Sequence, residues 1–247
     1  MKSKLFVLGS GSLVPDHRRY PASYLIQTPE KRILIDIGPG ILRQLSKMGL
    51  QYHELTAIFI THMHPDHILD LLTLFFASNY DPEKQSFRIN IYLHHTCREF
   101  LEAAIKPWQD WLQPSEIHFR WHFLSNQGRD LYFQWEKVPH HQSSLAYSFC
   151  INQKKILFTG DTAAFDYQSD FWQSPDYLII EAAKKDDKDG TKHLTIKQAV
   201  EIGKAIDAKQ LLITHIYPKL EKSITQFLKN KQSDNVRIVS DLMEFDL

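Results

Sequence analysis

The chain has 247 residues, which is enough for a sizeable core and fits one large α/β domain as well as two small ones. The chain has 29 lysines and arginines and 29 aspartates and glutamates, so its net charge is zero with histidine neutral. Proteins that bind nucleic acid over much of their surface usually carry a net positive charge. The two cysteines are far apart, and we find no signal-peptide pattern and no apolar run of transmembrane length. We therefore expect a cytoplasmic protein without disulfides or a membrane segment.

The first part of the chain predicts strands that are separated by glycine turns. The predicted elements are the strands Lys4–Leu8, Ser23–Gln27 and Arg32–Ile37 and the amphipathic helix Ile41–Met48, closed by Gly49. Asp36 lies at the end of the third strand, beside a glycine turn. We interpret Asp36 as a residue that bonds a ligand-bearing loop rather than as a metal ligand.

The next stretch, 57–67, carries the strongest chemical signal in the sequence. The apolar run Ala57–Ile60 predicts a buried strand, and Pro65 suits the first turn of a helix that continues over Ile68–Ala77. Strand-to-helix turns of this kind are where α/β sheets present their chemistry. Four side chains of metal-binding type lie on the turn: His62, His64, Asp66 and His67.

The residue types and their spacing predict a metal site. Imidazole together with carboxylate suits zinc, manganese or iron. His62 and His64 are two positions apart and can bind one ion from an extended segment, whereas the adjacent Asp66 and His67 diverge from them and can reach a second ion.

The middle of the chain is less informative. Phe87–Leu93 is a predicted strand that runs into His94 and His95, which we expect at the surface, and Arg98–Lys106 is a predicted helix. Four tryptophans follow, for which we favour core or lid packing over a pocket lining: Trp108, Trp111, Trp121 and Trp135.

The second half alternates between strands and loops. The predicted strands are Tyr132–Lys137, Tyr147–Ile151, Lys155–Phe158, Asp176–Ile180 and Gln210–Ile213. The charged segment 182–192 is expected to be a mobile loop, and Leu194–Ile206 is a predicted helix with Thr195 as its N-cap.

One regularity links the two halves. Five apolar strands each end in a polar residue of catalytic type: Asp36, His62, Asp161, Glu181 and His215. Buried parallel or mixed strands read as continuous apolar runs. If these strands end on one rim, the five side chains converge.

With this set of residues, most of the chain resembles the metallo-β-lactamase superfamily. The HxHxDH motif of that superfamily matches His62, His64, Asp66 and His67, its bridging aspartate matches Asp161, and its final histidine matches His215. The remaining histidine matches His140 best by spacing, with the neighbouring His141 left open. The resemblance implies an α/β fold, an αββα four-layer sandwich of two mixed β-sheets with helices outside, formed by residues 1–247 as a single domain.

The resemblance also implies two divalent metal ions, with zinc favoured and manganese or iron as alternatives. His62, His64 and His140 would hold one ion, and Asp66, His67 and His215 the other. Asp161 would bridge them, and Asp66 counts among the catalytic residues as well. Such a pair of ions can share a hydroxide that acts as the nucleophile.

Within the superfamily, the best likeness is to the ribonuclease Z and phosphodiesterase branch. The opening Gly9–Pro15 with Arg19, and the segment Ile35–Gly40, resemble the first two motifs of that branch. Glu181 and His193 match a catalytic pair that acts there at the leaving oxygen, where a histidine held by a glutamate can donate the proton that an alkoxide needs.

One departure from that branch sets the expected substrate. Its tRNA-processing members carry a long arm between the third histidine motif and the bridging aspartate, whereas His140 to Asp161 leaves room for a hairpin alone. We expect a phosphodiesterase that acts on small molecules or short oligonucleotides, cyclic diesters included. The alternatives are a tRNA 3′-processing endoribonuclease and a lactonase or thioester hydrolase. The phosphate could be held by Arg18, Arg19, Lys184 or Lys185, and the resemblance allows a homodimer.

Overall fold

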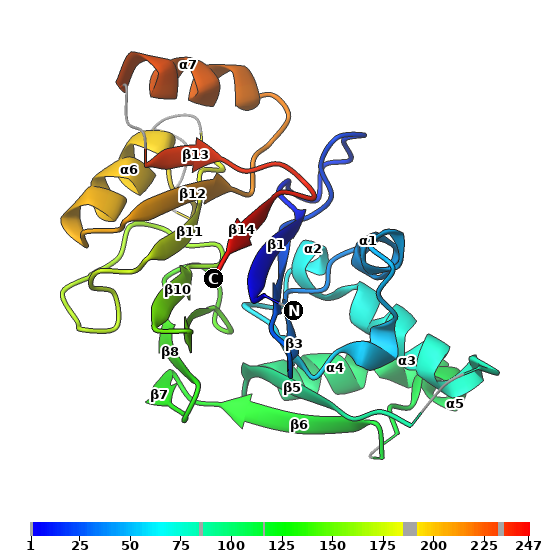
Figure 1. The fold of residues 1–247 in the computed structure, drawn as a ribbon. Helices are drawn as coiled ribbons and strands as arrows, with labels where there is room; N and C mark the ends of the chain where they lie inside the picture. The colour runs from blue at the N-terminus through cyan, green and yellow to red at the C-terminus, as the bar shows by residue number, and fades with distance from the viewer. Residues whose placement is uncertain (1, 84–85, 116, 185–191, 232–234) are drawn as a thin grey trace.

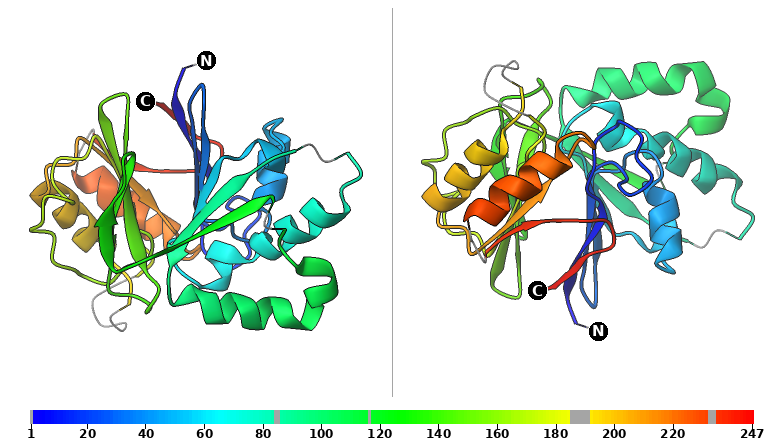
Figure 2. Two further views of the ribbon diagram at one scale, coloured as in Figure 1. Left: turned by 90° about the horizontal axis from the view of Figure 1, so that it is seen from below. Right: turned by 90° about the horizontal axis from the view of Figure 1, so that it is seen from above.

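The computed structural model describes residues 2–83, 86–115, 117–184, 192–231 and 235–247. Two mixed β-sheets lie face to face, and helices cover the outer side of each sheet (Figures 1 and 2). The predicted αββα sandwich is therefore confirmed.

The first sheet has seven strands in the described part of the chain. It is antiparallel from β14 to β3 and parallel from β3 to β6. In spatial order its strands are β14 (Glu244–Asp246), β1 (Lys4–Gly9), β2 (Ser23–Gln27), β3 (Arg32–Ile35), β4 (Ala57–Phe59), β5 (Ile89–His94) and β6 (Phe119–Leu124).

The second sheet also has seven described strands. It is parallel from β13 to β10 and antiparallel from β10 to β7. In spatial order its strands are β13 (Val236–Ile238), β12 (Gln210–Thr214), β11 (Tyr177–Glu181), β10 (Lys154–Phe158), β9 (Leu145–Ile151), β8 (Phe133–Lys137) and β7 (Gln127–Arg129).

The helices divide between the two outer faces. Those beside the first sheet are α1 (Ile41–Lys47), α2 (Pro65–Ile68), α3 (Asp70–Tyr80), α4 (Cys97–Ile105) and α5 (Gln109–Leu112), with short 3₁₀ helices at Tyr52–Glu54 and Lys106–Trp108. Those beside the second sheet are α6 (Ile196–Ala205) and α7 (Glu221–Lys231). Of the helices in these described ranges, none is long and apolar enough to cross a membrane.

Three apolar clusters hold the four layers together. One lies between the first sheet and its helices, one between the two sheets, and one between the second sheet and α6 and α7. Apolar residues on one side of α6 are buried, and Thr195 caps this helix as predicted, because its side chain accepts a hydrogen bond from the N–H of Gln198.

The parallel strands of both sheets end on a common rim. Ile35 of β3 is in register with Phe59 of β4, and Glu181 of β11 is in register with Thr214 of β12. The two sheets are joined at this rim, because the N–H of Leu145 donates to the carbonyl of Thr61 at 2.9 Å. The five polar strand ends named above therefore converge, as expected.

One expectation for the middle of the chain is wrong, and the packing expected for the tryptophans is found for two of the four. His94 is buried instead of exposed, because its two ring nitrogens contact Thr96 Oγ1 at 2.8 Å and Asn126 Oδ1 at 2.9 Å. Trp108 and Trp111 are half exposed and belong to no core, whereas Trp121 and Trp135 pack at the edges of the apolar clusters.

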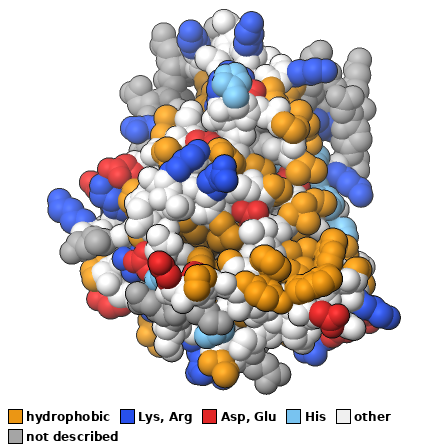
Figure 3. Space-filling model, turned by 90° about the vertical axis from the view of Figure 1, so that its right-hand side faces the viewer, with side chains coloured by type: hydrophobic (Ala, Val, Ile, Leu, Met, Phe, Trp, Pro, Cys, Tyr) orange, Lys and Arg blue, Asp and Glu red, His pale blue; other side chains and the backbone are white. Residues whose placement is uncertain are grey.

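Hydrophobic side chains gather on the helical face that turns to the right in Figure 1, as the space-filling view shows (Figure 3). From these helices, Phe76 and Tyr80 of α3 and Trp111 of α5 are each about half exposed.

Candidate metal centre

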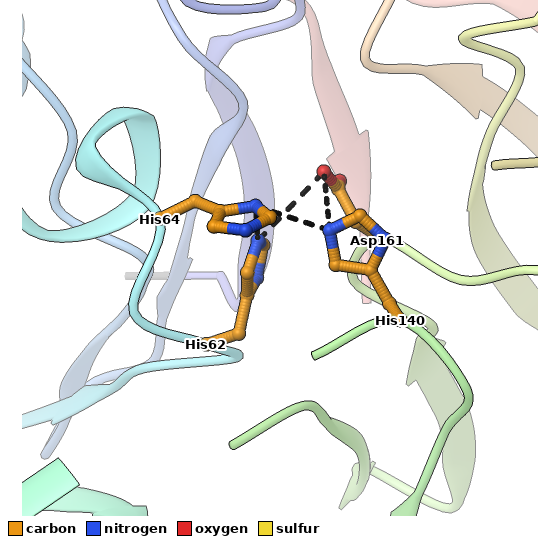
Figure 4. Close-up of side chains that lie close together, drawn as sticks. All are labelled: His62, His64, His140 and Asp161. Atoms are coloured by element: carbon orange, nitrogen blue, oxygen red, sulfur yellow. Dashed lines mark hydrogen bonds and ion pairs between the residues drawn. The ribbon is translucent and has the colours of Figure 1, made fainter. Parts of the chain in front are cut away.

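Three imidazole groups and one carboxylate converge at the rim between the sheets. His62 and His64 come from the turn after β4, and His140 and Asp161 come from loops of the second sheet (Figure 4). His64 Nδ1 lies 2.9 Å from His62 Nε2 and 3.1 Å from His140 Nε2. Asp161 Oδ2 lies 3.8 Å from Nε2 of both His62 and His140. This group could hold one ion.

A second group lies directly beside the first. His215 Nε2 is 3.2 Å from Asp66 Oδ2, and His67 Nε2 is 3.6 Å from the same oxygen. Asp161 Oδ2 lies 3.6 Å from His67 Nε2 and 3.3 Å from His215 Nε2. The same oxygen of Asp161 thus faces both groups, which is the position that a bridging ligand requires.

Hydrogen bonds outside the cluster orient three of the four imidazoles that present Nε2 to it. His67 Nδ1 donates to Asp36 Oδ2 at 2.7 Å, and His140 Nδ1 donates to the carbonyl of Lys192 at 2.7 Å. His62 Nδ1 lies 3.1 Å from Thr61 Oγ1, which itself donates to Asp36 Oδ2 and therefore accepts from the imidazole. In its neutral form, each of these rings points a lone pair of Nε2 into the site, as a metal ligand does.

One buried atom tests whether a metal fits. His67 Nε2 has no hydrogen-bond partner among the described residues, although buried polar groups are almost always satisfied. A carboxylate behind an imidazole, as Asp36 stands behind His67, is the arrangement that supports histidine ligands of metals. The donor set of imidazoles and carboxylates therefore fits a divalent metal site.

The charges of the cluster favour cations as well. Burial raises the pKa of Asp66, but the hydrogen bond from His215 and the charge of His67 outweigh it and lower the pKa to about 2. Burial lowers the pKa of His140 to about 4 and that of His62 well below its usual range. At neutral pH the site thus offers carboxylate charge and, at His62 and His140, the neutral imidazoles that metal binding needs. Burial lowers the pKa of His67, but the charges of Asp161 and Asp36 outweigh it and raise this pKa well above its usual range, so a metal ion would displace a proton from this ring.

Glu181 and His193 form a pair at the mouth of the cluster. His193 Nδ1 lies 3.0 Å from both carboxylate oxygens of Glu181, and its side chain is 27% exposed. The backbone N–H of Thr162 donates to Glu181 Oε1 at 2.6 Å, which fixes the carboxylate. Burial lowers the pKa of His193, but the hydrogen bond and charge of Glu181 outweigh it and raise the pKa above its usual value. The pair can hold a proton at a solvent-facing imidazole.

Asp36 lies where we expected, behind the candidate ligands and not among them. Its Oδ1 accepts from the N–H of Thr61 at 2.7 Å, so it holds the loop that carries His62. Sequence reasoning missed Thr61, whose hydroxyl orients His62, and Ser143, whose Oγ accepts from the N–H of Met63 at 3.1 Å. The position of Thr61 immediately before the HxHxDH motif was a signal that could have been used.

The structure brings His140 rather than His141 to the cluster. His141 Nδ1 lies 2.8 Å from Ser143 Oγ, and its ring is a neighbour of His64 alone among the cluster histidines. The ligand assignments themselves stay predictions.

The residues that were expected to bind phosphate are engaged with other groups or lie outside the described residues. Arg19 is buried and donates to Ser10 Oγ, the carbonyl of Val239 and Glu221, so it is unavailable to a substrate. Arg18 pairs with Asp16 and Glu221. The backbone of Lys184 pairs with that of Thr195 and Leu194, and Lys185 lies outside the described residues.

The comparison with protein families decides where this chain belongs. The model of the family described as "Anti-Pycsar protein Apyc1" matches residues 3–235. The chain belongs to this family. Among curated proteins, this member of the Apyc1 family is similar to ribonuclease Z of Pyrobaculum aerophilum, with 26% identity over 86% of both chains.

Solved structures show the same fold. The metallo-β-lactamase fold protein YhfI from Bacillus subtilis superposes on this Apyc1 family member with a TM-score of 0.81 and 23% identity, and each chain is covered completely. Human tRNase Z, short form, superposes with a TM-score of 0.79 and 23% identity over 98% of both chains. The metallo-β-lactamase fold and the likeness to the ribonuclease Z branch, both predicted from the sequence, are confirmed.

Proposed function

We propose that this protein is a dinuclear, metal-dependent phosphodiesterase that acts on small or short phosphodiesters. One observation carries the proposal: the Glu181–His193 pair stands at the mouth of a cluster of metal-type ligands, with His193 Nδ1 3.9 Å from Asp161 Oδ2. A metal centre alone would serve many hydrolases. A proton donor beside it suits a substrate whose leaving oxygen is an alkoxide.

The proposed metal ligands are the seven side chains that converge at the rim. We assign His62, His64 and His140 to one ion, Asp66, His67 and His215 to the other, and Asp161 to both, with zinc favoured over manganese or iron. When bound, such ions would lower the pKa of a coordinated water to about 7 and would supply positive charge for the transition state.

The protein's own residues supply orientation and a proton. Because Glu181 is fixed by the N–H of Thr162 and binds His193 through Nδ1, the other nitrogen, Nε2, is left to face the substrate. His193 would donate its Nε2 proton to the departing oxygen as the phosphorus–oxygen bond breaks. Asp36 and Thr61 would keep His67 and His62 in their ligand orientation throughout.

The short connection between His140 and Asp161 supports a small substrate. These residues form β9, the turn at Asn152 and Gln153, and β10, and a protruding arm has no place in this hairpin. The zero net charge also favours a substrate with few phosphates, because phosphate contacts dominate the affinity for long nucleic acids.

The second candidate is a tRNA 3′-processing endoribonuclease, which the name of the ribonuclease Z relatives favours. The third candidate function for the same centre is a lactonase or thioester hydrolase. The test is to load purified protein with zinc or manganese and to assay bis-p-nitrophenyl phosphate, a panel of cyclic nucleotides, a lactone and a pre-tRNA. We expect turnover of the small diesters. Activity on the pre-tRNA at least equal to that on the diesters would overturn the substrate choice.

Three further expectations from the sequence stay proposals. We propose that residues 1–247 act as a single domain, that the protein works in the cytoplasm, and that it forms a homodimer. Size-exclusion chromatography with light scattering tests the homodimer, and a monomer at micromolar concentration would contradict it.

A further inference from the structure

Tyr217 lies on the rim of the candidate metal centre, two residues after His215. Its ring is half-buried and meets the ring of His215 edge-on, with centroids 6.1 Å apart and planes at 84°. The ring of His193 stacks on the same imidazole at 5.7 Å and 15°. Tyr217 and the proposed proton donor are therefore ring neighbours of one candidate ligand.

The backbone on both sides of Tyr217 is anchored, which fixes the point from which its side chain projects. The N–H of Ile216 donates to the carbonyl of Ser10 at 3.1 Å, and Gly11 pairs with Ile216 in a β-bridge. On the other side, the carbonyl of Tyr217 accepts from the N–H of Leu220 at 2.8 Å. Preorganisation of this kind lowers the entropy cost of binding a ligand.

The Tyr217 hydroxyl is an uncharged group that can donate a hydrogen bond. The hydroxyl has no hydrogen-bond partner among the residues that the structure describes. It is therefore available to a ligand, and an anionic oxygen is the best acceptor for it.

We propose that Tyr217 is a substrate-positioning residue whose hydroxyl donates a hydrogen bond to a non-bridging oxygen of the phosphodiester. This inference rests on the proposed function and adds a residue to it. Arg18 and Arg19 are both engaged with Glu221, so the guanidinium groups first expected to hold the phosphate leave this task open. A phenol suits the position because it adds a donor without a charge that would compete for the carboxylates of the metal centre.

The test compares Tyr217→Phe, which removes the hydroxyl alone, with wild type and with Tyr80→Phe. Tyr80 is a matched control because its ring is about half exposed on α3 and is no neighbour of the cluster. Two measurements are made on zinc-loaded protein: the kcat and KM for bis-p-nitrophenyl phosphate, and the Kd of inorganic phosphate by calorimetry. Metal content is measured for all three proteins and should be equal.

We expect Tyr217→Phe to raise both KM and the phosphate Kd about tenfold with kcat nearly unchanged, because a hydrogen bond made equally in the ground and transition states acts on binding. Tyr80→Phe should match wild type. Values of KM and Kd within twofold of wild type, or a loss confined to kcat, would overturn the proposal. If wild type turns over no diester, the proposed function fails, while the comparison of phosphate Kd values still decides the role of Tyr217.

Discussion

Asp36 and His67 form a fully buried pair in which the Nδ1–H of the imidazole donates to Oδ2 of the carboxylate at 2.7 Å. The same carboxylate accepts from both the N–H and the hydroxyl of Thr61. Asp36 therefore fixes the orientation of His67 and, through Thr61, that of His62. One side chain outside the proposed ligand set thus sets the geometry of a ligand in each half of the centre.

We predict that Asp36→Asn weakens metal binding. The amide keeps the size of the side chain but loses the charge that supports His67, and outer-shell changes of this kind cost about 10–100-fold in metal affinity. Zinc affinity is measured by competition with a chromogenic chelator. Asp176→Asn is the control, because Asp176 bonds Lys155 and Lys209 beside the start of β11, far from the rim. A zinc affinity equal to wild type for Asp36→Asn would contradict this role.

The choice between His140 and His141 can be settled by metal content. His140→Ala removes one of the imidazole nitrogens that converge on His64, so we expect it to lose about one equivalent of zinc. His141→Ala removes a ring that contacts Ser143 instead and should keep the wild-type content. The measurement is elemental analysis after dialysis against trace zinc. The opposite pattern would move the ligand assignment to His141.

If His193 donates the proton, the effect of removing it on the rate of hydrolysis should depend on the leaving group. His193→Ala should slow hydrolysis of a diester with an alkyl alcohol leaving group by about 10²–10⁴-fold. The same variant should hydrolyse bis-p-nitrophenyl phosphate at a rate close to that of wild type, since p-nitrophenolate departs without a proton. Steady-state rates on the two substrates test this, with His95→Ala, an exposed histidine after β5, as the control. Equal losses on both substrates would rule out the proton-donor role.

The pH profile gives a separate test of the Glu181–His193 pair. Burial lowers the pKa of His193, and Glu181 raises it by more, so the imidazole holds its proton above the usual histidine range. A donor must be protonated, so kcat/KM for the alkyl diester should fall as the pH rises through this raised pKa. Glu181→Gln removes the negative charge that raises the pKa of His193 but leaves the ring as buried as before. The pKa of His193 should therefore fall, and the alkaline limb of the profile should move to lower pH. An alkaline limb that stays in place would assign it to another group.

The sequence was sufficient for the fold and for the set of residues at the rim. Continuous apolar strands that end in polar side chains placed Asp36, His62, Asp161, Glu181 and His215 on one edge, because parallel strands of a sheet present their ends together. The edge strands β6, β7, β13 and β14 and the helix α7 were not predicted. Three of these strands have only three residues, which carry too little periodicity to be recognised.

What the sequence could not give depends on contacts between distant residues. The exposure of His94 was mispredicted because its partner Asn126 comes from beyond the next strand. Arg19 resembled a phosphate ligand until the structure placed Glu221 against it. The backbone at Asp36 and His215 has φ values of 59° and 53°, which non-glycine residues rarely adopt, and such local conformations at site residues have no signal in composition or spacing.

The central claim is that seven side chains bind two metal ions and that Asp161 contacts both ions. The most direct measurement is anomalous diffraction at the zinc edge from crystals of the zinc-loaded protein. We predict two peaks about 3.5–4 Å apart, one beside His62, His64 and His140 and one beside Asp66, His67 and His215, with Asp161 contacting both. A single peak, or none within reach of Asp161, would contradict the account.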